Sequence, residues 1–437
     1  MDIALLGSVV GQDAALRRRQ TLQPSGGQGD KIFPPTYPGE GRNPPPRHVY
    51  ERRQRDGQEK WCVLIDSVQS QANRLEECLL DAIAEGVPIP HVVVDFSDAG
   101  LDGITRITSL DAPHRVYDAI LRDSLLEGEP FMSSSIGQRL VKAKSEDASA
   151  LLETSPTALL FGAWHSTGEG GGLGAKFARS LISEVVAVDV PVEFQEARQS
   201  AVSYVAGIGD RVENVTPVTS GLRPGSRIDP LGIQRSVKIY RSSENAGDWT
   251  PDADKAAKDG KDNPILFSRK KGDKSGRPSV INHGNIAPSL QPLGITCDHA
   301  EHTFVLSFAA LRRLRFGNLE RNTAGRSLLA ALGLLALTEQ DARGYALRSR
   351  CDLVCDGRAP LEIVHPDGTT DTVTVDCKAA RALYEKAFDA AKKVGFKLSA
   401  DPIVLTPQEK LVEIVRKSQE LALSGAGGEG DETGDDE

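Results

Sequence analysis

Segments with the residue pattern of strands and of helices follow one another irregularly along this chain. The runs "KWCVLID", "HVVVDF" and "TFVLSF" predict strands, and "SVQSQANRLEECLLDAIAEG" predicts a helix that closes at Gly86. A long stretch rich in proline and glycine, "QPSGGQGDKIFPPTYPGEGRNPPPR", predicts a loop. This irregular order favours an α+β fold with long excursions and does not fit a regular doubly wound sheet.

Other segments predict further elements. The apolar run "TALLFGAW" predicts a strand, and Asp111 is placed to cap a helix that begins at Pro113. A helical segment is expected over residues 136–154. Two amphipathic helices are expected over residues 379–394 and 406–423.

The composition excludes several protein classes. At 437 residues, the chain is long enough for two or three domains, or for one domain with large insertions. No stretch approaches the ~20 apolar residues of a membrane span, and no secretory leader is evident, so we expect a cytoplasmic protein with no membrane partner. The six cysteines form no C-x-x-C pair, which predicts reduced thiols.

The net charge of −9 hides an uneven distribution of charge. The terminal "GAGGEGDETGDDE" carries six acidic and no basic residues, which predicts a disordered tail. Residues 255–277 carry eight basic and three acidic residues. Three smaller basic clusters are Arg17 to Arg19; Arg52, Arg53 and Arg55; and Arg312, Arg313 and Arg315. An acidic protein with such clusters can still present basic strips to a nucleic-acid backbone.

A glycine-rich segment, "AWHSTGEGGGLGAKFARSLISE", suggests a phosphate-binding loop. It does not fit the Walker pattern, because Ala175 separates Gly174 from Lys176 and Phe177 stands where the hydroxyl belongs. The spacing of its glycines also fails the dinucleotide-binding pattern. The loop can still present several backbone N–H groups to an anion, although a surface connection between two strands explains the glycines equally well.

Two further segments combine loop or helix-start geometry with cations. The helix start at Ser67 crowds Gln69, Ser70, Gln71, Asn73 and Arg74 into its first turns, which is typical of an anion site; alternatively, Arg74 pairs with Glu77 or Asp81 on a capped helix. In "RPGSR", Arg223 and Arg227 flank a turn and can fork onto phosphates. Three such elements indicate a polyanion that runs over a surface.

Catalytic and metal sites are weaker interpretations of the remaining polar residues. His114, close to Asp111, and His165 are candidates for catalysis, but packing or a phosphate contact explains each more simply. Cys297, His299 and His302 could form a zinc site with Cys351 and Cys355. A strand over "HTFVLSF" would separate the two histidines, so we expect no metal, no cofactor and no catalytic residue.

Six ordered motifs give the chain a specific resemblance. These are "LQPSGGQGDKIFPPTY", "LIDSVQSQANRLEECLL", "ITSLDAPHRVYDAILRDSLL", "PTALLFGAWHSTGEGGGLGAKFARSLISEVVAVD", "SGLRPGSRIDPLGI" and "TFVLSFAALRRLRFG". Together they resemble the RAMP-superfamily backbone subunit of type I-G (formerly I-U) CRISPR surveillance complexes. The resemblance runs from about residue 16 to about residue 317 and continues more loosely through the C-terminal helices.

The resemblance implies a fold and a division of the chain. It implies an RRM-like (ferredoxin-like) palm with large finger and thumb insertions and C-terminal helices. The expected division is a first part of the palm over residues 1–240, a basic insertion that could be thumb or finger over 241–290, the rest of the palm with the C-terminal helices over 291–423, and the acidic tail over 424–437.

The resemblance also implies RNA-binding residues. Related backbone subunits open the first palm helix with Ser-Ser-Gln-x-x-Lys-Arg, and Gln69 and Asn73 depart from that signature. Arg74 is therefore expected to be the main phosphate contact at this helix start. The expected RNA contacts are Ser70, Gln71, Asn73, Arg74, His114, Arg115, Gly170, Gly171, Gly172, Lys176, Arg179, Arg223 and Arg227. Because aromatic residues make up only 5% of the chain, we expect recognition of the RNA backbone rather than of its bases.

The expected function is that of a scaffold without catalytic activity. Copies of the subunit would polymerise head to tail along a CRISPR guide RNA (crRNA), alongside the other subunits of the Cascade complex. The guide would then pair with target DNA, and cutting would be left to a recruited nuclease. The alternative is a metal-dependent endoribonuclease that acts on guide or target RNA through an acid such as Asp111 or Asp229.

Overall fold

The computed structural model describes the chain from Met1 to Leu423, apart from the gaps given next. These are residues 39–46, 56, 166–175, 196–202, 207–230, 235, 246, 269–274 and 284–292, and residues 424–437 also lie outside the description. The chain divides into two units. The first is Met1–Ile208 with Leu293–Ile414, and the second is Gly209–Pro292 with Val415–Glu437.

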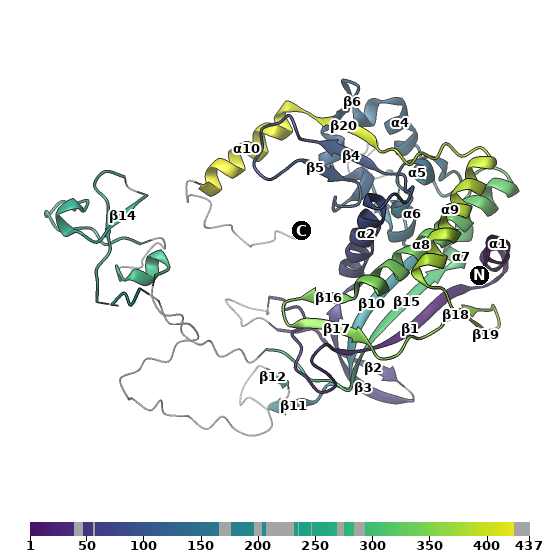
Figure 1. Ribbon diagram of the computed structural model, residues 1–437, viewed down its shortest axis with the longest axis horizontal. Helices are drawn as coiled ribbons and strands as arrows, with labels where there is room; N and C mark the ends of the chain where they lie inside the picture. Colours follow the sequence, from purple (N-terminus) through teal and green to yellow (C-terminus); the bar gives the residue numbers. More distant parts are fainter. Residues whose placement is uncertain are drawn as a thin grey trace. The chain divides into compact units, whose positions relative to one another are not determined.

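A nine-stranded antiparallel sheet is the framework of the first unit (Figure 1). Seven strands follow the order β16-β17-β1-β15-β10-β3-β2, while β18 pairs with β1 and β19 pairs with β18. The strands are β1 (Ala15–Pro24), β2 (Tyr50–Arg55), β3 (Gln58–Asp66), β10 (Leu181–Val188), β15 (His299–Ser307), β16 (Tyr345–Arg348), β17 (Cys351–Cys355), β18 (Leu361–Val364) and β19 (Thr370–Val373).

Four neighbouring strands of this sheet are linked by two helices. α2 (Val68–Ala84) lies in the chain between β1 and β10, and these two strands run parallel with β15 between them. α8 (Leu319–Arg343) lies between β15 and β17, which run parallel with β1 between them. The helices contact each other, and α2 packs on β10 while α8 packs on β15. Two interleaved β-α-β segments therefore build the centre of the unit.

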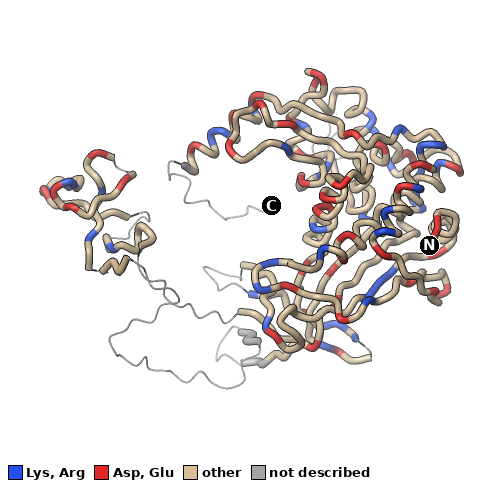
Figure 2. Tube along the Cα trace, viewed as in Figure 1, with Lys and Arg blue, Asp and Glu red and all other residues tan. Residues whose placement is uncertain are grey.

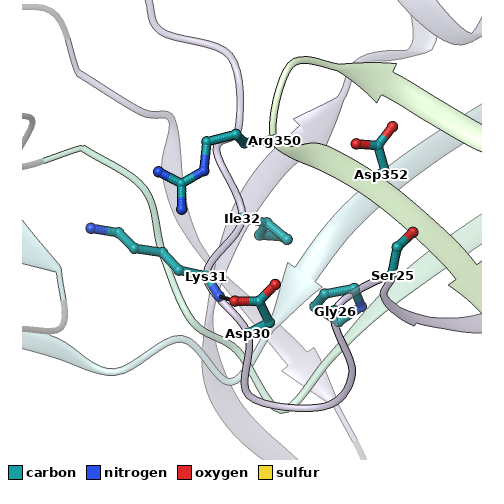
Figure 3. A pocket seen from close by; sticks show the side chains of 8 residues that line it. Ser25, Gly26, Asp30, Lys31, Ile32, Arg350 and Asp352 are labelled. Carbon is teal, nitrogen blue, oxygen red and sulfur yellow. Dashed lines mark hydrogen bonds between the residues drawn. The ribbon is translucent and has the colours of Figure 1, made fainter. Parts of the chain in front are cut away.

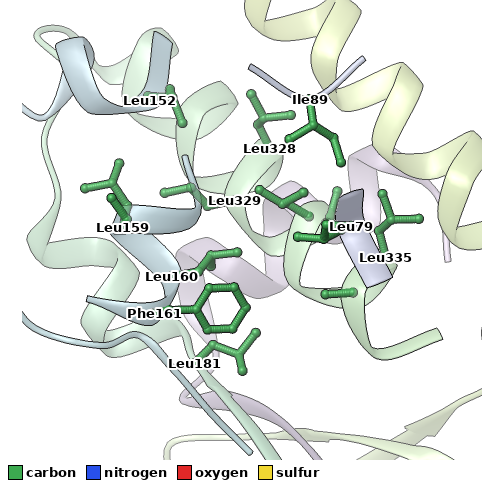
Figure 4. Close-up of a cluster of buried hydrophobic side chains, with 14 of the residues drawn as sticks. Leu79, Ile89, Leu152, Leu159, Leu160, Phe161, Leu181, Leu328, Leu329 and Leu335 are labelled. Atoms are coloured by element: carbon green, nitrogen blue, oxygen red, sulfur yellow. The ribbon is translucent and has the colours of Figure 1, made fainter. Parts of the chain in front are cut away.

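The core of the first unit surrounds α8. Its middle, from Ser327 to Gln340, is buried on every side, as expected for a helix that is apolar all round (Figure 4). Leu79 of α2, Leu181 of β10 and residues of smaller helices pack around it. Gly325 of α8 lets the Phe316 ring approach, because a Cβ there would lie 2.9 Å from that ring. The buried middle of α8 is thus the centre of the core of this unit.

The remaining elements of the first unit are short, apart from α9. A five-stranded sheet has the order β5-β4-β20-β6-β7, with β4 (Val92–Asp95), β5 (Arg106–Thr108), β6 (Ser124–Leu126), β7 (Glu129–Pro130) and β20 (Ile403–Pro407). Two strand pairs are β8 (Ala163–Trp164) with β9 (Lys176–Phe177), and β11 (Val192–Gln195) with β12 (Ser203–Ala206). The helices and 3-10 turns are α1 (Ile3–Gln12), η1 (Arg115–Tyr117), α3 (Ala119–Arg122), η2 (Phe131–Ser133), α4 (Ser135–Val141), α5 (Ser149–Thr154), α6 (Thr157–Phe161), α7 (Phe308–Arg313) and α9 (Cys377–Lys393), and α10 (Glu409–Leu423) ends in the second unit.

The second unit has a small core of its own. Ile239, Phe267 and Ile281 cluster there, beside the strand pair of β13 (Tyr240–Arg241) and β14 (Trp249–Thr250). Two 3-10 turns, η3 (Ala253–Lys255) and η4 (Pro278–Ile281), complete its described elements. The expected role of residues 241–290 as thumb or finger stays a prediction.

The α+β class predicted from the sequence is confirmed, and three local predictions are wrong. "TALLFGAW" forms α6 and then β8, because its first five residues turn as a helix that ends at Gly162 with φ 86°. Residues 136–154 form α4 and α5 rather than one helix. Asp111 caps no helix, since its carboxylate accepts hydrogen bonds from the backbone N–H and hydroxyl of Thr108.

Candidate nucleic-acid interface

The first turns of α2 converge on one buried carboxylate, that of Asp66 at the end of β3. Asp66 accepts hydrogen bonds from Ser70 Oγ at 2.8 Å, Gln71 Nε2 at 2.7 Å and Arg74 Nε at 2.9 Å. Arg348, at the end of β16, adds a fourth donor at 2.9 Å. We call these five residues the Asp66 cluster. It brings Ser70, Gln71 and Arg74 together around an internal anion.

Arg74 is oriented by this cluster but keeps one edge unused. Its Nε and Nη2 atoms face Asp66, and Nη2 also donates to the Leu347 carbonyl oxygen. Its Nη1 atom makes no hydrogen bond to the described residues, and the side chain is 24% exposed. The alternative in which Arg74 pairs with Glu77 or Asp81 is therefore wrong: its partner precedes the helix.

The N-terminus of α2 is capped by its own chain. Ser67 is the N-cap residue, and its hydroxyl accepts a hydrogen bond from the Ser70 N–H at 3.2 Å. Gln69 and Asn73 lie exposed on the surface of the helix. These polar side chains thus divide into a buried or half-buried group that holds the strand–helix junction and an exposed group that faces solvent.

A chain of buried hydrogen bonds extends from Gln71 into the sheet. Ser183 Oγ donates to Gln71 Oε1 at 2.9 Å and lies 2.6 Å from His302 Nε2. The other ring nitrogen of His302 lies 2.9 Å from the Tyr345 hydroxyl, which donates to Asp341. Full burial lowers the pKa of His302 to about 3, with a further lowering by Arg18. His302 is therefore neutral in the folded protein at neutral pH.

Arg115 of η1 forms a second buried ion pair, with Glu76 of α2. Its Nε and Nη2 atoms donate to the Glu76 carboxylate at 2.8 and 2.6 Å, and Nη1 donates to the Gly162 carbonyl oxygen at 3.1 Å. Burial raises the pKa of Glu76, although Arg115 opposes this shift. Arg115 thus ties α2 to the turn that leads into the glycine-rich loop.

The two ends of the glycine-rich loop form a short strand pair with a basic surface. Trp164 of β8 lies opposite Lys176 of β9, and Lys176 Nζ is 5.5 Å from the centre of the Trp164 ring. Trp164 is 56% exposed, and Lys176 is also exposed. Arg179 Nε donates to the Phe161 carbonyl oxygen at 3.1 Å, and burial together with nearby Arg115 lowers the pKa of Arg179. We call Trp164, Lys176 and Arg179 the loop base.

The remaining predicted contacts are less defined. His114 has an exposed side chain, and its backbone N–H donates to Asp118. Gly170, Gly171, Gly172, Arg223 and Arg227 lie outside the described residues. The structure therefore groups Ser70, Gln71 and Arg74 at one place, and Arg115, Lys176 and Arg179 at another.

The basic clusters of β1 and β2 do not form unpaired strips. On one face of the sheet, Arg17 pairs with Glu362, Arg19 and Arg55 with Glu301, and Arg53 with Glu51 and Glu184. On the other face, Arg18 forms a buried pair with Asp341, and Arg52 pairs with Glu59 in solvent. Figure 2 shows basic and acidic residues close together on this sheet. The third cluster differs, because Arg313 and Arg315 are exposed while Arg312 donates to the carbonyl oxygens of Val10 and Asp13.

The residues weighed for metal binding and catalysis have other partners. His299 and His302 lie on opposite faces of β15, and His299 contacts Asp298. All six cysteines are free thiols, and burial raises the pKa of Cys297 to about 12. Among the described residues, no group of three or more histidine, cysteine or acidic side chains is arranged to hold a metal ion. His165 is buried against the Tyr117 ring, and Asp229 lies outside the described residues.

Sequence reasoning missed two members of the Asp66 cluster. The sequence did hold a signal for Asp66: an acidic residue ends an apolar strand directly before a helix whose first turns are rich in hydrogen-bond donors. The sequence held no signal for Arg348, since 282 positions separate it from Asp66.

None of the helices in the described part of the chain has the length and apolar character that a membrane span requires.

The comparison with protein families covers the part of the chain that holds both groups of residues. Residues 16–192 match the family model described as CRISPR-associated protein GSU0053. The matched range includes β1, β3, α2 and the loop base. No curated protein matches the sequence. The match over residues 16–192 identifies this part of the chain as CRISPR-associated, in agreement with the resemblance that the sequence motifs carry.

Proposed function

We propose that the protein is an RNA-binding backbone subunit of a type I CRISPR surveillance complex and has no catalytic role of its own. Several copies assemble head to tail along the guide RNA, in the open, heterologous arrangement that builds filaments. The bound guide is held for pairing with target DNA, and a recruited nuclease cuts the target. The family match supports a role in CRISPR defence, and the residues below support the RNA-binding role.

The loop base is the observation that carries this proposal. Lys176 is exposed and forms no ion pair with the described residues, and Arg179 lies beside Arg115 with its charge partly desolvated. A phosphate placed here would relieve the repulsion between the two guanidinium groups. The glycines between Trp164 and Lys176 allow the chain to approach an RNA backbone closely. Unpaired cations beside a glycine-rich segment favour a phosphate ligand.

Arg74 supplies a second phosphate contact in this proposal. Asp66 and the Leu347 carbonyl oxygen fix the Nε and Nη2 side of the guanidinium, so Nη1 is directed without further loss of side-chain entropy. Because Asp66 is buried and already accepts four donors, it acts as a support for Arg74.

The strand order also supports the palm that the resemblance implies. β17-β1-β15-β10, with α2 and α8 as the two crossovers, has the order and directions of a ferredoxin-like β-α-β-β-α-β unit. We propose that this unit is the RRM-like palm and that β2 and β3 extend it at one edge. Few aromatic side chains are available to stack bases, so backbone contacts would dominate and any guide sequence could bind.

The test mixes the purified full chain with end-labelled guide RNAs of several sequences in magnesium buffer. Gel mobility reports on binding, and a denaturing gel reports on RNA length. We expect intact RNA, several copies of the protein per guide and an affinity that falls steeply with salt. The double variant Arg74→Ala/Lys176→Ala should lose affinity for all guide sequences equally.

Lys386→Ala is the matched control, because Lys386 is an exposed cation on α9, outside both groups of residues and outside the basic clusters. Sequence-selective loss in the double variant would contradict backbone recognition. Magnesium-dependent shortening of the RNA that disappears in Asp229→Ala or Asp111→Ala would replace the scaffold by the endoribonuclease. A wild-type protein that binds no guide would end the proposal.

A further inference from the structure

A small hollow lies at the end of β1, next to the Asp66 cluster. Three segments form it: the end of β1 with the two residues after it, the loop that contains Asp30 to Ile32, and the turn between β16 and β17 (Figure 3). Its volume is about 170 Å³. The β16–β17 turn connects the hollow to the Asp66 cluster, because Arg348 donates to Asp66 while Arg350, two residues later, lines the hollow.

Two cations extend to one side of the hollow. The Lys31 ammonium lies 5.4 Å from the centre of the Phe33 ring, and the Arg350 guanidinium lies 4.4 Å from it. Figure 3 shows both side chains reaching in the same direction. Neither forms an ion pair with a carboxylate among the described residues, unlike Arg74 and Arg348. Both charges are therefore open to an anion.

The backbone at Arg350 is held in an unusual conformation. Its φ is 59°, in the left-handed region that residues with a Cβ rarely adopt. The Phe33 N–H donates to the Arg350 carbonyl oxygen at 3.0 Å, which ties the turn to the loop. Strain of this kind persists where the surroundings enforce it, and it is found often at ligand sites. Here it places the guanidinium over the Phe33 ring.

The other side of the hollow carries hydrogen-bond acceptors. Asp352 and Ser25 lie across from the two cations (Figure 3). The Ser25 N–H donates to the Asp352 carbonyl oxygen at 2.9 Å, while the Asp352 carboxylate is exposed and has no hydrogen-bond partner among the described residues. Asp30 is engaged locally, since it accepts from the Lys31 N–H at 2.8 Å. Asp352 is thus the free acceptor.

We propose that this hollow binds one sugar–phosphate unit of the guide and distinguishes RNA from DNA. Lys31 and Arg350 bind the phosphate, and the ribose 2′-hydroxyl donates a hydrogen bond to the Asp352 carboxylate. The 2′-hydroxyl is the group by which a protein tells RNA from DNA at a given site. The inference rests on the proposed function, and it extends the RNA path from Arg74 across the β16–β17 turn.

The test compares a guide RNA with the single-stranded DNA of the same sequence, bound by the full chain at several salt concentrations. Arg350→Gly combined with Lys31→Gln removes both charges, and glycine adopts the positive φ at position 350 without strain. We expect this pair to lower affinity for RNA and DNA alike and to flatten the plot of log affinity against log salt by about 0.7, the contribution of the one phosphate that both cations bind. Lys386→Ala, which removes an exposed cation on α9, is the control.

Asp352→Ala tests the ribose contact separately. We expect wild type to prefer RNA over DNA and the variant to lose several-fold of that preference with an unchanged salt slope. Asp389→Ala, which removes an exposed carboxylate on α9, should keep the preference. Thermal melting of each variant confirms that it folds.

Three outcomes would overturn the inference while leaving the proposed function intact. These are an unchanged salt slope in the double variant when Lys176→Ala lowers it, a wild-type protein without preference for RNA, and an RNA preference that survives Asp352→Ala. Wild-type protein that binds neither RNA nor DNA would instead refute the proposed function, and this inference would fall with it.

Discussion

The Asp66 cluster and the loop base both contain basic side chains, but in opposite electrostatic settings. In the Asp66 cluster, two arginines share a fully buried carboxylate, so their charge is largely spent on holding β3, α2 and β16 together. At the loop base, Lys176 lies over an exposed tryptophan and has no carboxylate partner among the described residues. The number of cations therefore does not measure affinity for phosphate; what each cation already contacts does.

Asp66→Ala should produce the largest effect, on stability. The substitution leaves Arg74 and Arg348 facing a buried site without an anion, and the loss of one partner of a buried pair costs about 3–5 kcal/mol. Urea unfolding of the full chain would measure this. Asp66→Asn, which keeps the size of the side chain and one acceptor oxygen, should cost less. A change below about 1 kcal/mol for Asp66→Ala would contradict the view that the cluster is primarily structural.

The hydrogen-bond chain behind the Asp66 cluster predicts a pH dependence of stability. Burial holds the pKa of His302 at about 3, against 6.5 for an unperturbed histidine. Between these values the unfolded state binds a proton that the folded state does not, so stability falls as the pH drops below 6.5. We expect this group to remove about 2 kcal/mol between pH 7 and pH 5.

The measurement is urea unfolding of wild type and His302→Gln at both pH values. Burial also lowers the pKa values of His48 and His165, so all three histidines weaken the fold in acid. The difference between the two proteins isolates His302, and the wild type should lose more stability than the variant. Equal losses would show that His302 is protonated or exposed in the folded state.

Lys176→Gln at the loop base should differ from Asp66→Ala: it should weaken RNA binding and leave stability nearly unchanged. Because its ammonium is exposed and unpaired among the described residues, its removal should leave stability within about 0.5 kcal/mol of wild type. In guide-RNA binding it should reduce the salt slope by roughly 0.7, the contribution of one phosphate contact to a single strand. Arg74→Gln should lower both stability and binding. If Lys176→Gln alters only stability, the contrast between the two regions is wrong.

The sequence predicted the helices, strands and candidate residues of these two regions better than the partners that those residues contact. Strand and helix periodicity located β3, β15, α2 and α9 closely, because each buries one face or one stripe. The five residues of α6 are wrongly predicted as part of a strand, since a short, mostly apolar run has no distinguishing period. The polar helix start predicted a site at Ser70, Gln71 and Arg74, and the structure brings the three side chains together at Asp66, while their contact with RNA stays a prediction.

The shared partner of those side chains was harder to predict from sequence. Asp66 precedes α2, but its role depends on Arg348, which only the long-range packing of β16 and β17 brings to it. The same packing places Arg350 beside Lys31. Residue types and local spacing therefore predict which side chains are candidates for phosphate binding, whereas tertiary contacts decide which of their charges remain available.

The smallest effect is expected at an exposed ion pair of the sheet. It tests whether the stability of the Asp66 cluster comes from burial or from ion pairing alone. Arg52 and Glu59 form an ion pair at 3.3 Å whose side chains are 54% and 50% exposed. Solvent screens such a pair, so Glu59→Gln should change the free energy of unfolding by less than about 0.5 kcal/mol. Urea unfolding beside Asp66→Ala makes the comparison direct. A loss of several kcal/mol for Glu59→Gln would mean that pairing alone stabilises the sheet, and burial would no longer explain why Asp66 holds its arginines.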